Sequence, residues 1–224
     1  MPTTPTDLNT LKAAKQNTLL RPLDAAIFLA PWYTAHPTSF TDAVAVLQTL
    51  PEAYDPVGLI SKSDGINFAR NVETSVLDSY GELEPTRMDV TGDSTTLSFT
   101  PQQTTKLTLQ LTNNVDLSAA KATKGSGEVF FAQSTSPKIT YYSAIVIGKD
   151  GPDDEPIFAF KVMPKIAVSK YEGETWNKDA AMTSQKLTMT AFKDQTAGFA
   201  VGHGFGGKGW LKILADVGFE LNTV

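Results

Sequence analysis

Apolar residues recur at every second position in several separate stretches of this chain, and this alternation constrains the fold more than any other feature. The clearest stretches are residues 72–76, 88–90 and 187–191. A period of two is the spacing of a β-strand that buries one face. The apolar run at residues 25–30 suits a strand buried on both faces. The sequence therefore predicts a mainly β fold, an antiparallel β-sandwich or barrel of two sheets with one or two flanking α-helices.

One segment carries signals for both a helix and a strand. Residues 100–103, Thr-Pro-Gln-Gln, fit a capping box in which Thr100 caps a helix and a glutamine three residues later returns the hydrogen bond. The pair Asn113-Asn114 suits a helix end. Leucines at every second position from 107 to 111 support a strand instead. The caps favour a helix over residues 101–112, and a strand is the alternative.

Other local signals predict turns and strand ends. A turn is predicted at residues 91–94, Thr-Gly-Asp-Ser, and a short helix capped by Ser39 is predicted to carry Phe40 on its apolar face. Residues 128–133 have strand character. Pro164 lies within strand-like sequence, which implies an edge position or the end of a strand.

The charge balance and the lack of cysteine exclude several classes of function. Lysine and arginine total 19 against 24 acids, a net charge of −5, whereas proteins that grip DNA phosphates are usually basic. An acidic surface is compatible with DNA that passes without sticking. With no cysteine and only two histidines, neither a disulfide framework nor a zinc site is expected.

The chain is organised as an N-terminal arm over residues 1–24 and a single domain over residues 25–224. The arm is polar and too poor in apolar residues to order by itself. It lacks the apolar core of a signal peptide, and no run approaches the roughly 20 apolar residues that span a bilayer. We expect a soluble protein that is made in a cytoplasm and has no membrane partner.

The glycine run at residues 202–209, GHGFGGKG, matches two phosphate-binding templates. The P-loop requires Ser or Thr after Lys208, but Gly209 stands there, and both templates require a following helix within a βαβ unit. We therefore predict a flexible turn, in which glycines allow close approach of another backbone, and no cofactor. The consecutive acids at 153–155 lack calcium-loop spacing, so no metal site is predicted, and no catalytic residue is assigned.

A resemblance covers most of the chain from about residue 56 to residue 214. The segments 79–87 (SYGELEPTR), 155–165 (EPIFAFKVMPK) and 206–210 (GGKGW) resemble the major tail tube proteins of long-tailed, non-contractile (siphovirus-type) phages, especially those of actinobacterial hosts. The motifs are moderately specific as a set and weak individually.

The resemblance implies a structural virion protein, not an enzyme. Members of the family pack two sheets with a helix at the side and form hexameric rings, which stack into the hollow tail tube that conducts DNA from capsid to cell. Its partners would be other copies of itself, the tape measure protein, and the tail terminator and tip proteins. DNA would pass without specific binding, and the N-terminal arm would order against a neighbour. The alternatives are a monomeric β-barrel module for a small ligand and the tube protein of a contractile injection system.

Two groups of charged residues are candidate sites under this interpretation. Residues 72–93 hold six acids against one base, Arg87. A solvated sheet face would explain this excess, and a lumen wall is the functional reading. Four of the acids are predicted to line the lumen or its rim: Glu73, Asp78, Glu82 and Glu84. Lys208 and Lys212 are predicted to meet acidic loops of the adjacent ring.

Overall fold

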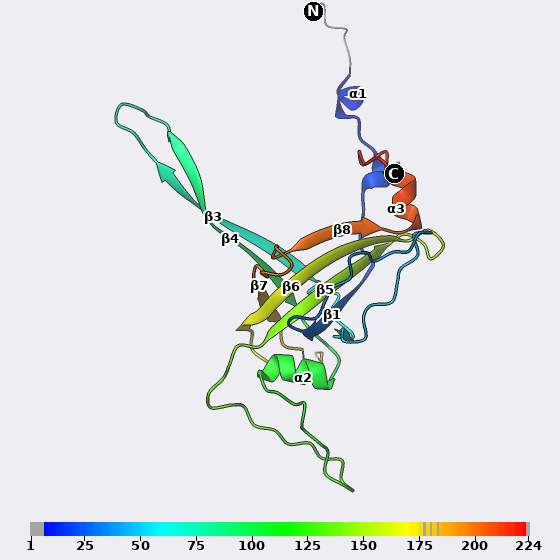
Figure 1. The fold of residues 1–224 in the computed structure, drawn as a ribbon, viewed down its shortest axis with the longest axis vertical. Coiled ribbons are helices and arrows are strands. Elements are labelled where there is room, and N and C mark those ends of the chain that lie inside the picture. The colour runs from blue at the N-terminus through cyan, green and yellow to red at the C-terminus, as the bar shows by residue number, and fades with distance from the viewer. Residues whose placement is uncertain (1–6, 177, 180, 183, 223–224) are drawn as a thin grey trace, which may run out of the picture.

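The structure is a computed structural model that describes residues 7–176, 178–179, 181–182 and 184–222 (Figure 1). The described residues form eight strands and few helices. The strands are β1 (Asp24–Pro31), β2 (Asp55–Pro56), β3 (Asn67–Leu77), β4 (Arg87–Phe99), β5 (Tyr141–Asp150), β6 (Ile157–Tyr171), β7 (Leu187–Ala191) and β8 (Gly202–Gly206). The helices are α1 (Leu8–Lys12), the 3₁₀ turn η1 (Gln16–Thr18), α2 (Lys106–Asn113) and α3 (Lys208–Ile213). The predicted mainly β fold is confirmed.

All eight strands belong to one antiparallel sheet, in the order β2-β1-β5-β6-β7-β4-β3, with β8 paired to β6 outside this path. We predicted two sheets, and the single hydrogen-bonded sheet follows from the length of β6. This strand has 15 residues, whereas β7 and β8 have 5 each, so both fit along one of its edges. β8 pairs with the first half of β6 and β7 with the second half, while β5 occupies the opposite edge.

Pro164 lies inside β6, at the position where the strand changes partners. β8 pairing ends at Val162 and β7 pairing begins at Ile166. On the other edge, the register with β5 shifts between Tyr142 and Ala144, which marks a β-bulge. A proline is tolerated at a bulge because no ladder hydrogen bond needs its missing N–H. The predicted strand end at this proline is therefore wrong, since β6 continues to Tyr171. The alternative, an edge strand, is wrong too, because β6 has partner strands on both sides.

The central strands bury side chains on both faces of the sheet. In β5, Ala144 and Val146 join one core cluster, whereas Ile145 and Ile147 join the other. The first cluster holds most of the largest buried side chains: Ile27, Leu29, Leu97, Phe99, Leu111, Met163, Ile166, Leu187 and Met189. On the opposite face, Phe40 stacks on Phe160 with 4.6 Å between ring centroids. β1 is thus buried on both faces, as its apolar run predicted.

The helix prediction for residues 101–112 is confirmed, but α2 starts later than its cap signal indicated. Its N-cap is Thr105, which forms a reciprocal capping box with Thr108. Thr100 is buried at the end of β4, and Pro101 forms an isolated bridge with Ile60. The helix ends at Asn113, followed by Asn114 in the left-handed region (φ 50°).

The segment from Trp32 to Tyr54 covers one face of the sheet without forming the predicted helix. Ser39 donates its hydroxyl hydrogen to the carbonyl of Thr41 and caps nothing. The Asp42 carboxylate accepts hydrogen bonds from the N–H groups of Val44 and Val46, and Thr41 bridges to Leu47. These local side-chain bonds favour a turn over a helix. Phe40 still packs against the core, so burial of the apolar side chain was predicted correctly.

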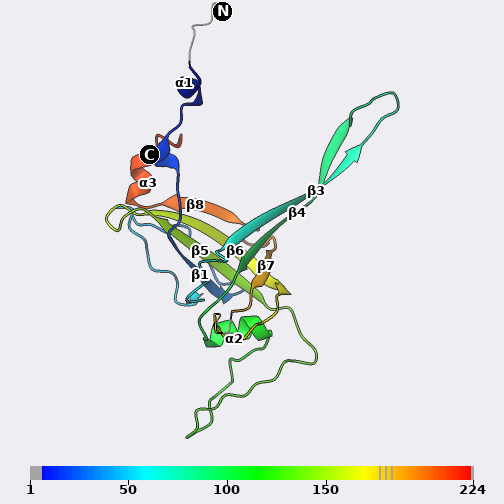
Figure 2. The same ribbon diagram turned by 180° about the vertical axis from the view of Figure 1, so that it is seen from behind.

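Two segments extend from the body of the molecule at opposite ends of its longest axis (Figures 1 and 2). One end carries α1, α3 and the last described residues. The other end carries the long loop over residues 115–140, which contains no strand, although residues 128–133 were predicted to form one. No helix among the described residues has the length and apolar character needed to cross a membrane.

Candidate assembly surfaces

A two-stranded arm projects from the sheet (Figures 1 and 2). β3 and β4 pair from Asn67↔Ser98 to Leu77↔Arg87, but β7 covers β4 only from Thr95 onward. Residues 71–94 therefore form a ribbon of two strands and a turn, which we call the arm. Its residues are exposed on both faces, except that Gly92 is partly covered.

The turn of the arm lies at residues 78–86, so the predicted turn at 91–94 is wrong. Thr86 donates its N–H to the carbonyl of Leu77 and closes the turn. Gly92 instead lies inside β4 opposite Glu73, beside a bulge in which Thr91 is the extra residue, since Thr74 pairs with Val90. A Cβ on Gly92 would lie 3.1 Å from a carboxylate oxygen of Glu73. The glycine thus marks the place where the Glu73 side chain crosses the partner strand.

One face of the arm is apolar over most of its length. Val76 lies opposite Met88 and Thr74 opposite Val90, so these side chains share a face, while Ser75 lies opposite Asp89 on the other. The exposed fractions of Val76, Met88 and Val90 are 49%, 67% and 65%. An isolated two-stranded ribbon is at best marginally stable in water. The apolar face is therefore a surface that a partner would stabilise by covering.

Two of the six acids in the arm form ion pairs, and the four predicted lumen acids are the others. Arg70 binds the carboxylate of Asp93 through two nitrogens, at 2.9 and 2.6 Å, and this hydrogen bonding lowers the pKa of Asp93. Arg87 binds Asp89 at 2.8 Å. Glu73, Asp78, Glu82 and Glu84 are exposed and take part in no ion pair among the described residues. The structure brings them together on one projecting arm.

The glycine run forms a strand and the entry to a helix, not the flexible turn that we predicted. Residues 202–206 are β8, and α3 follows directly. A Cβ on Gly207, whose φ is 105°, would lie 2.3 Å from the carbonyl oxygen of Pro156, and one on Gly209 would lie 2.5 Å from that of Glu155. The close backbone approach that we expected of these glycines is confirmed. It packs α3 against the β5–β6 turn.

The two predicted ring-contact lysines have different surroundings on α3. Lys212 forms an ion pair with Glu155 across this packed contact. Lys208 is exposed and forms no ion pair among the described residues. Lys208 is thus the one of the two whose charge is available to another molecule.

A groove of about 600 Å³ opens on one face of the sheet. Its walls are largely apolar, with Ile60, Ile66 and Phe68 on one side and Val146 on the other, and Lys161 reaches into it. The ammonium of Lys161 lies 4.6 Å from the Phe68 ring centroid, and burial lowers its pKa. Sequence reasoning missed this site, although a lysine within the apolar run FAFKVM is a signal for it.

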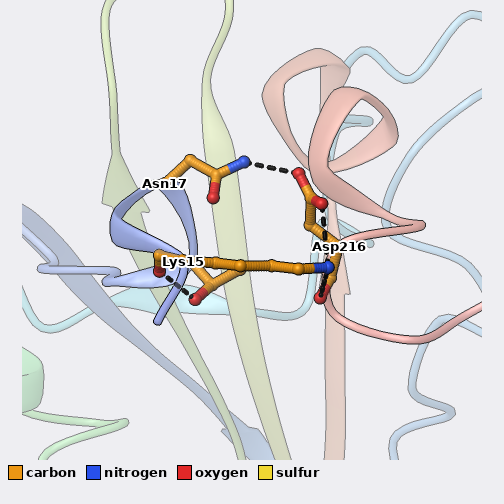
Figure 3. A network of polar contacts seen from close by, with 4 residues as sticks. Lys15, Asn17 and Asp216 are labelled. Atoms are coloured by element: carbon orange, nitrogen blue, oxygen red, sulfur yellow. Dashed lines mark hydrogen bonds and ion pairs between the residues drawn. The ribbon is translucent and has the colours of Figure 1, made fainter. Parts of the chain in front are cut away.

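The N-terminal segment is tied to the C-terminal segment through Asp216 (Figure 3). Lys15 lies 3.0 Å from one carboxylate oxygen of Asp216, and Asn17 donates to the other at 2.6 Å. These hydrogen bonds lower the pKa of Asp216. Helix α1 buries none of its residues, so this network holds a segment that packing leaves free. Residues 1–6 of the predicted N-terminal arm lie outside the described residues.

No cluster of three or more potential metal-binding side chains occurs in the part of the chain that the structure describes. What distinguishes this antiparallel β protein is its projecting, partly apolar segments, and such segments are typical of proteins that assemble with copies of themselves. The family model described as phage tail tube protein matches residues 12–200. The chain therefore belongs to the phage tail tube protein family and is a structural component of a virion tail. No curated protein matches the sequence.

Proposed function

We propose that the chain forms hexameric rings, which stack into the tail tube of a long-tailed, non-contractile phage with an actinobacterial host. Membership of the tail tube family supports a tubular assembly, and the sequence resemblance supports the finer assignment. In this role the protein is made in the host cytoplasm, performs no chemistry, and has the tape measure, terminator and tip proteins as its partners besides other copies of itself. DNA crosses the lumen during ejection without specific binding.

The arm is the observation that carries this proposal. Its two strands extend beyond the sheet and expose Val76, Met88 and Val90 on one face. A monomer leaves this face in water, whereas a neighbouring subunit in a ring or tube buries it and stabilises both partners. An exposed apolar surface on an extended ribbon is otherwise a liability for aggregation.

In this proposal, the acidic residues of the arm give the wall of the lumen a negative charge. We place Glu73, Asp78, Glu82 and Glu84 at the lumen or its rim, where negative charge repels the DNA backbone and keeps it moving. Lys208 and Lys212 belong to the proposed contact between rings. Ion pairs at such an exposed contact weaken with salt, so tube length should depend on ionic strength.

Electron microscopy of the purified protein at rising concentration tests the proposal. Hollow rings or tubes of uniform diameter are the expected result, in amounts that rise with concentration. The matched control replaces Val76 with aspartate, which keeps the arm's length but places a charge on its apolar face. A wild-type protein that stays monomeric at every concentration, or a V76D variant that forms the same tubes, would contradict the proposed role of the arm.

A further inference from the structure

An exposed aromatic patch lies at the end of the molecule that carries α3 (Figure 1). The Trp210 ring stacks on Phe205, with 4.8 Å between centroids, and lies 6.2 Å from Phe219. Half of Phe205 and 60% of Phe219 remain exposed. We call this group the C-terminal patch: Phe205, Trp210, Leu211, Phe219 and Leu221. Three aromatic rings held together in water form a preorganised surface for another apolar group.

A second apolar patch lies at the opposite end, in the loop over residues 115–140 (Figures 1 and 2). Phe130 is 88% exposed and the adjacent Val129 is 49% exposed. We call these two residues the loop patch. They belong to no strand, but the preceding residues form a turn, in which Thr123 donates its N–H to the carbonyl of Glu128 and Gly127 donates its N–H to the carbonyl of Thr123.

The placement of the two patches determines the kind of contact they can make. A surface that pairs with itself closes a two-fold dimer and stops growth. Two different surfaces at opposite ends of the long axis instead produce a head-to-tail contact, which repeats along an axis unless a rotation between copies closes it into a ring. The patches therefore suit axial stacking of copies in one direction.

Among the described residues, both the loop and the end that carries α3 expose charges of both signs. Lys121, Lys124 and Glu128 lie in the loop, and none forms an ion pair among the described residues. At the other end Asp154, Lys208 and Glu220 are exposed and also form none in the described part of the chain. The two loop lysines can face Asp154 and Glu220, while Glu128 can face Lys208. Opposite charges around an apolar centre fix the orientation of two surfaces.

We propose that the loop patch of one copy packs against the C-terminal patch of the next copy along the tube axis. This inference rests on the proposed tubular assembly and names the surfaces that join one ring to the next. Phe130 is the central contact residue of the loop, and its ring packs against the aromatic surface formed by Phe205, Trp210 and Phe219. Lys208 contributes through its free charge, whereas Lys212 remains bound to Glu155.

The test uses the full chain with Phe130→Asp in one protein and Phe219→Asp in another. Both side chains are mostly exposed, so the variants should fold, which circular dichroism checks. Each variant should form single rings but raise the concentration needed for elongation by about tenfold or more, because a charge replaces an anchor aromatic. Phe130→Tyr and Phe219→Tyr keep the aromatic surface and should elongate like wild type.

Mixing the two aspartate variants tests the direction of the contact. The intact loop of F219D rings can bind the intact C-terminal patch of F130D rings, so the mixture should contain paired rings and no longer stacks. A mixture that holds only single rings, or an F130D protein that forms long tubes alone, would overturn the inference. Loss of the rings themselves in a folded F130D protein would also overturn it, since the loop would then act within a ring. A wild-type protein without rings would contradict the proposed function instead.

Discussion

The ammonium nitrogen of Lys161 lies 2.9 Å from Nδ1 of His203, so two basic side chains from paired strands meet at the groove. Burial lowers the pKa of His203, and the positive charges of Lys161 and Arg70 lower it further. The neutral imidazole accepts a hydrogen bond from the lysine, whereas the protonated ring would repel it. The folded protein therefore favours the neutral form of His203.

The pKa of His203 predicts how stability depends on pH. Because the folded state binds this proton less tightly than the unfolded state, the stabilising contribution is complete above a pH of about 6.5 and is lost as the pH falls through the lower folded pKa. His203→Gln removes the titrating group, so the free energy of unfolding should decline less between neutral and mildly acidic pH. Urea titrations across this range measure it, with His36→Gln as the single-histidine control. An equal decline in wild type and H203Q would contradict the prediction.

The packing of Phe99 predicts a large effect on stability. Its side chain is completely buried in the first core cluster. Phe99→Ala removes that apolar surface and leaves a cavity, which typically costs about 3–5 kcal/mol. Phe130→Ala is the matched control, since its exposed ring should change the free energy of unfolding by less than about 0.5 kcal/mol. Chemical denaturation of both variants provides the comparison, and similar midpoints would show that Phe99 is not part of the core.

The capping box of α2 predicts a moderate effect of Thr105 on the free energy of unfolding. The Thr105 hydroxyl accepts the N–H of Thr108 at 3.2 Å, and the Thr108 hydroxyl accepts the N–H of Thr105 at 2.8 Å. Thr105→Ala removes one acceptor and should lower the free energy of unfolding by about 1 kcal/mol. Thr105→Ser keeps the hydroxyl and should retain most of the stability. The cap would be unimportant if both variants unfolded at the same urea concentration.

The contacts of Asp216 with Lys15 and Asn17 predict an effect on the order of the N-terminal segment without an effect on the stability of the whole fold. Lys15 and Asp216 are exposed, and an exposed ion pair contributes little to stability. Asp216→Asn should therefore leave the midpoint of unfolding almost unchanged but increase hydrogen exchange at residues 15–18. Asp154→Asn, which breaks no ion pair in the described part of the chain, is the control. Unchanged exchange in D216N would show that the network does not hold the N-terminal segment.

The acidic arm predicts an effect on DNA passage. Replacing Glu73, Asp78, Glu82 and Glu84 with lysine reverses the charge of the proposed lumen and should slow genome ejection, because DNA phosphates then bind the wall. Tubes should still form, which microscopy of the virions checks. Replacement of the same residues with glutamine separates loss of repulsion from gain of attraction. Normal ejection by the lysine variant would count against a lumen position.

The sequence predicts strands well where the pattern is local. Alternation in residues 187–191 corresponds to β7, whose burial also alternates, and the uninterrupted apolar run at residues 25–30 corresponds to β1. The helix α2 was also predicted, although Thr100 and Thr105 both suit a cap. Only the burial of Thr100 at the end of β4 decides between them. Burial depends on the assembled core, which no local pattern contains.

Features that depend on distant pairing were not predicted. Residues 91–94 have the composition of a turn, but so does the segment with Gly81 and Pro85, and the register of β3 against β4 selects the latter. In the same way, β3, β6 and β8 bring Arg70, Lys161 and His203 together from separate parts of the chain. The pairing of Asp93 with Arg70 likewise depends on this register. The sequence identifies the acidic arm, but the fold determines which of its acids stay unpaired.

The length of β6 has a consequence for how the protein is made. Its residues leave the ribosome after those of β1, β3, β4 and β5, yet β5, β7 and β8 all pair with it. Until β6 emerges, β5 has only β1 beside it, and β4 has only β3. The nascent chain therefore carries two incomplete pieces of sheet with open edges, which can capture each other or a neighbouring chain. The order of synthesis differs from the order of pairing, and the yield of correctly folded subunits depends on how quickly β6 and β7 together join those two pieces.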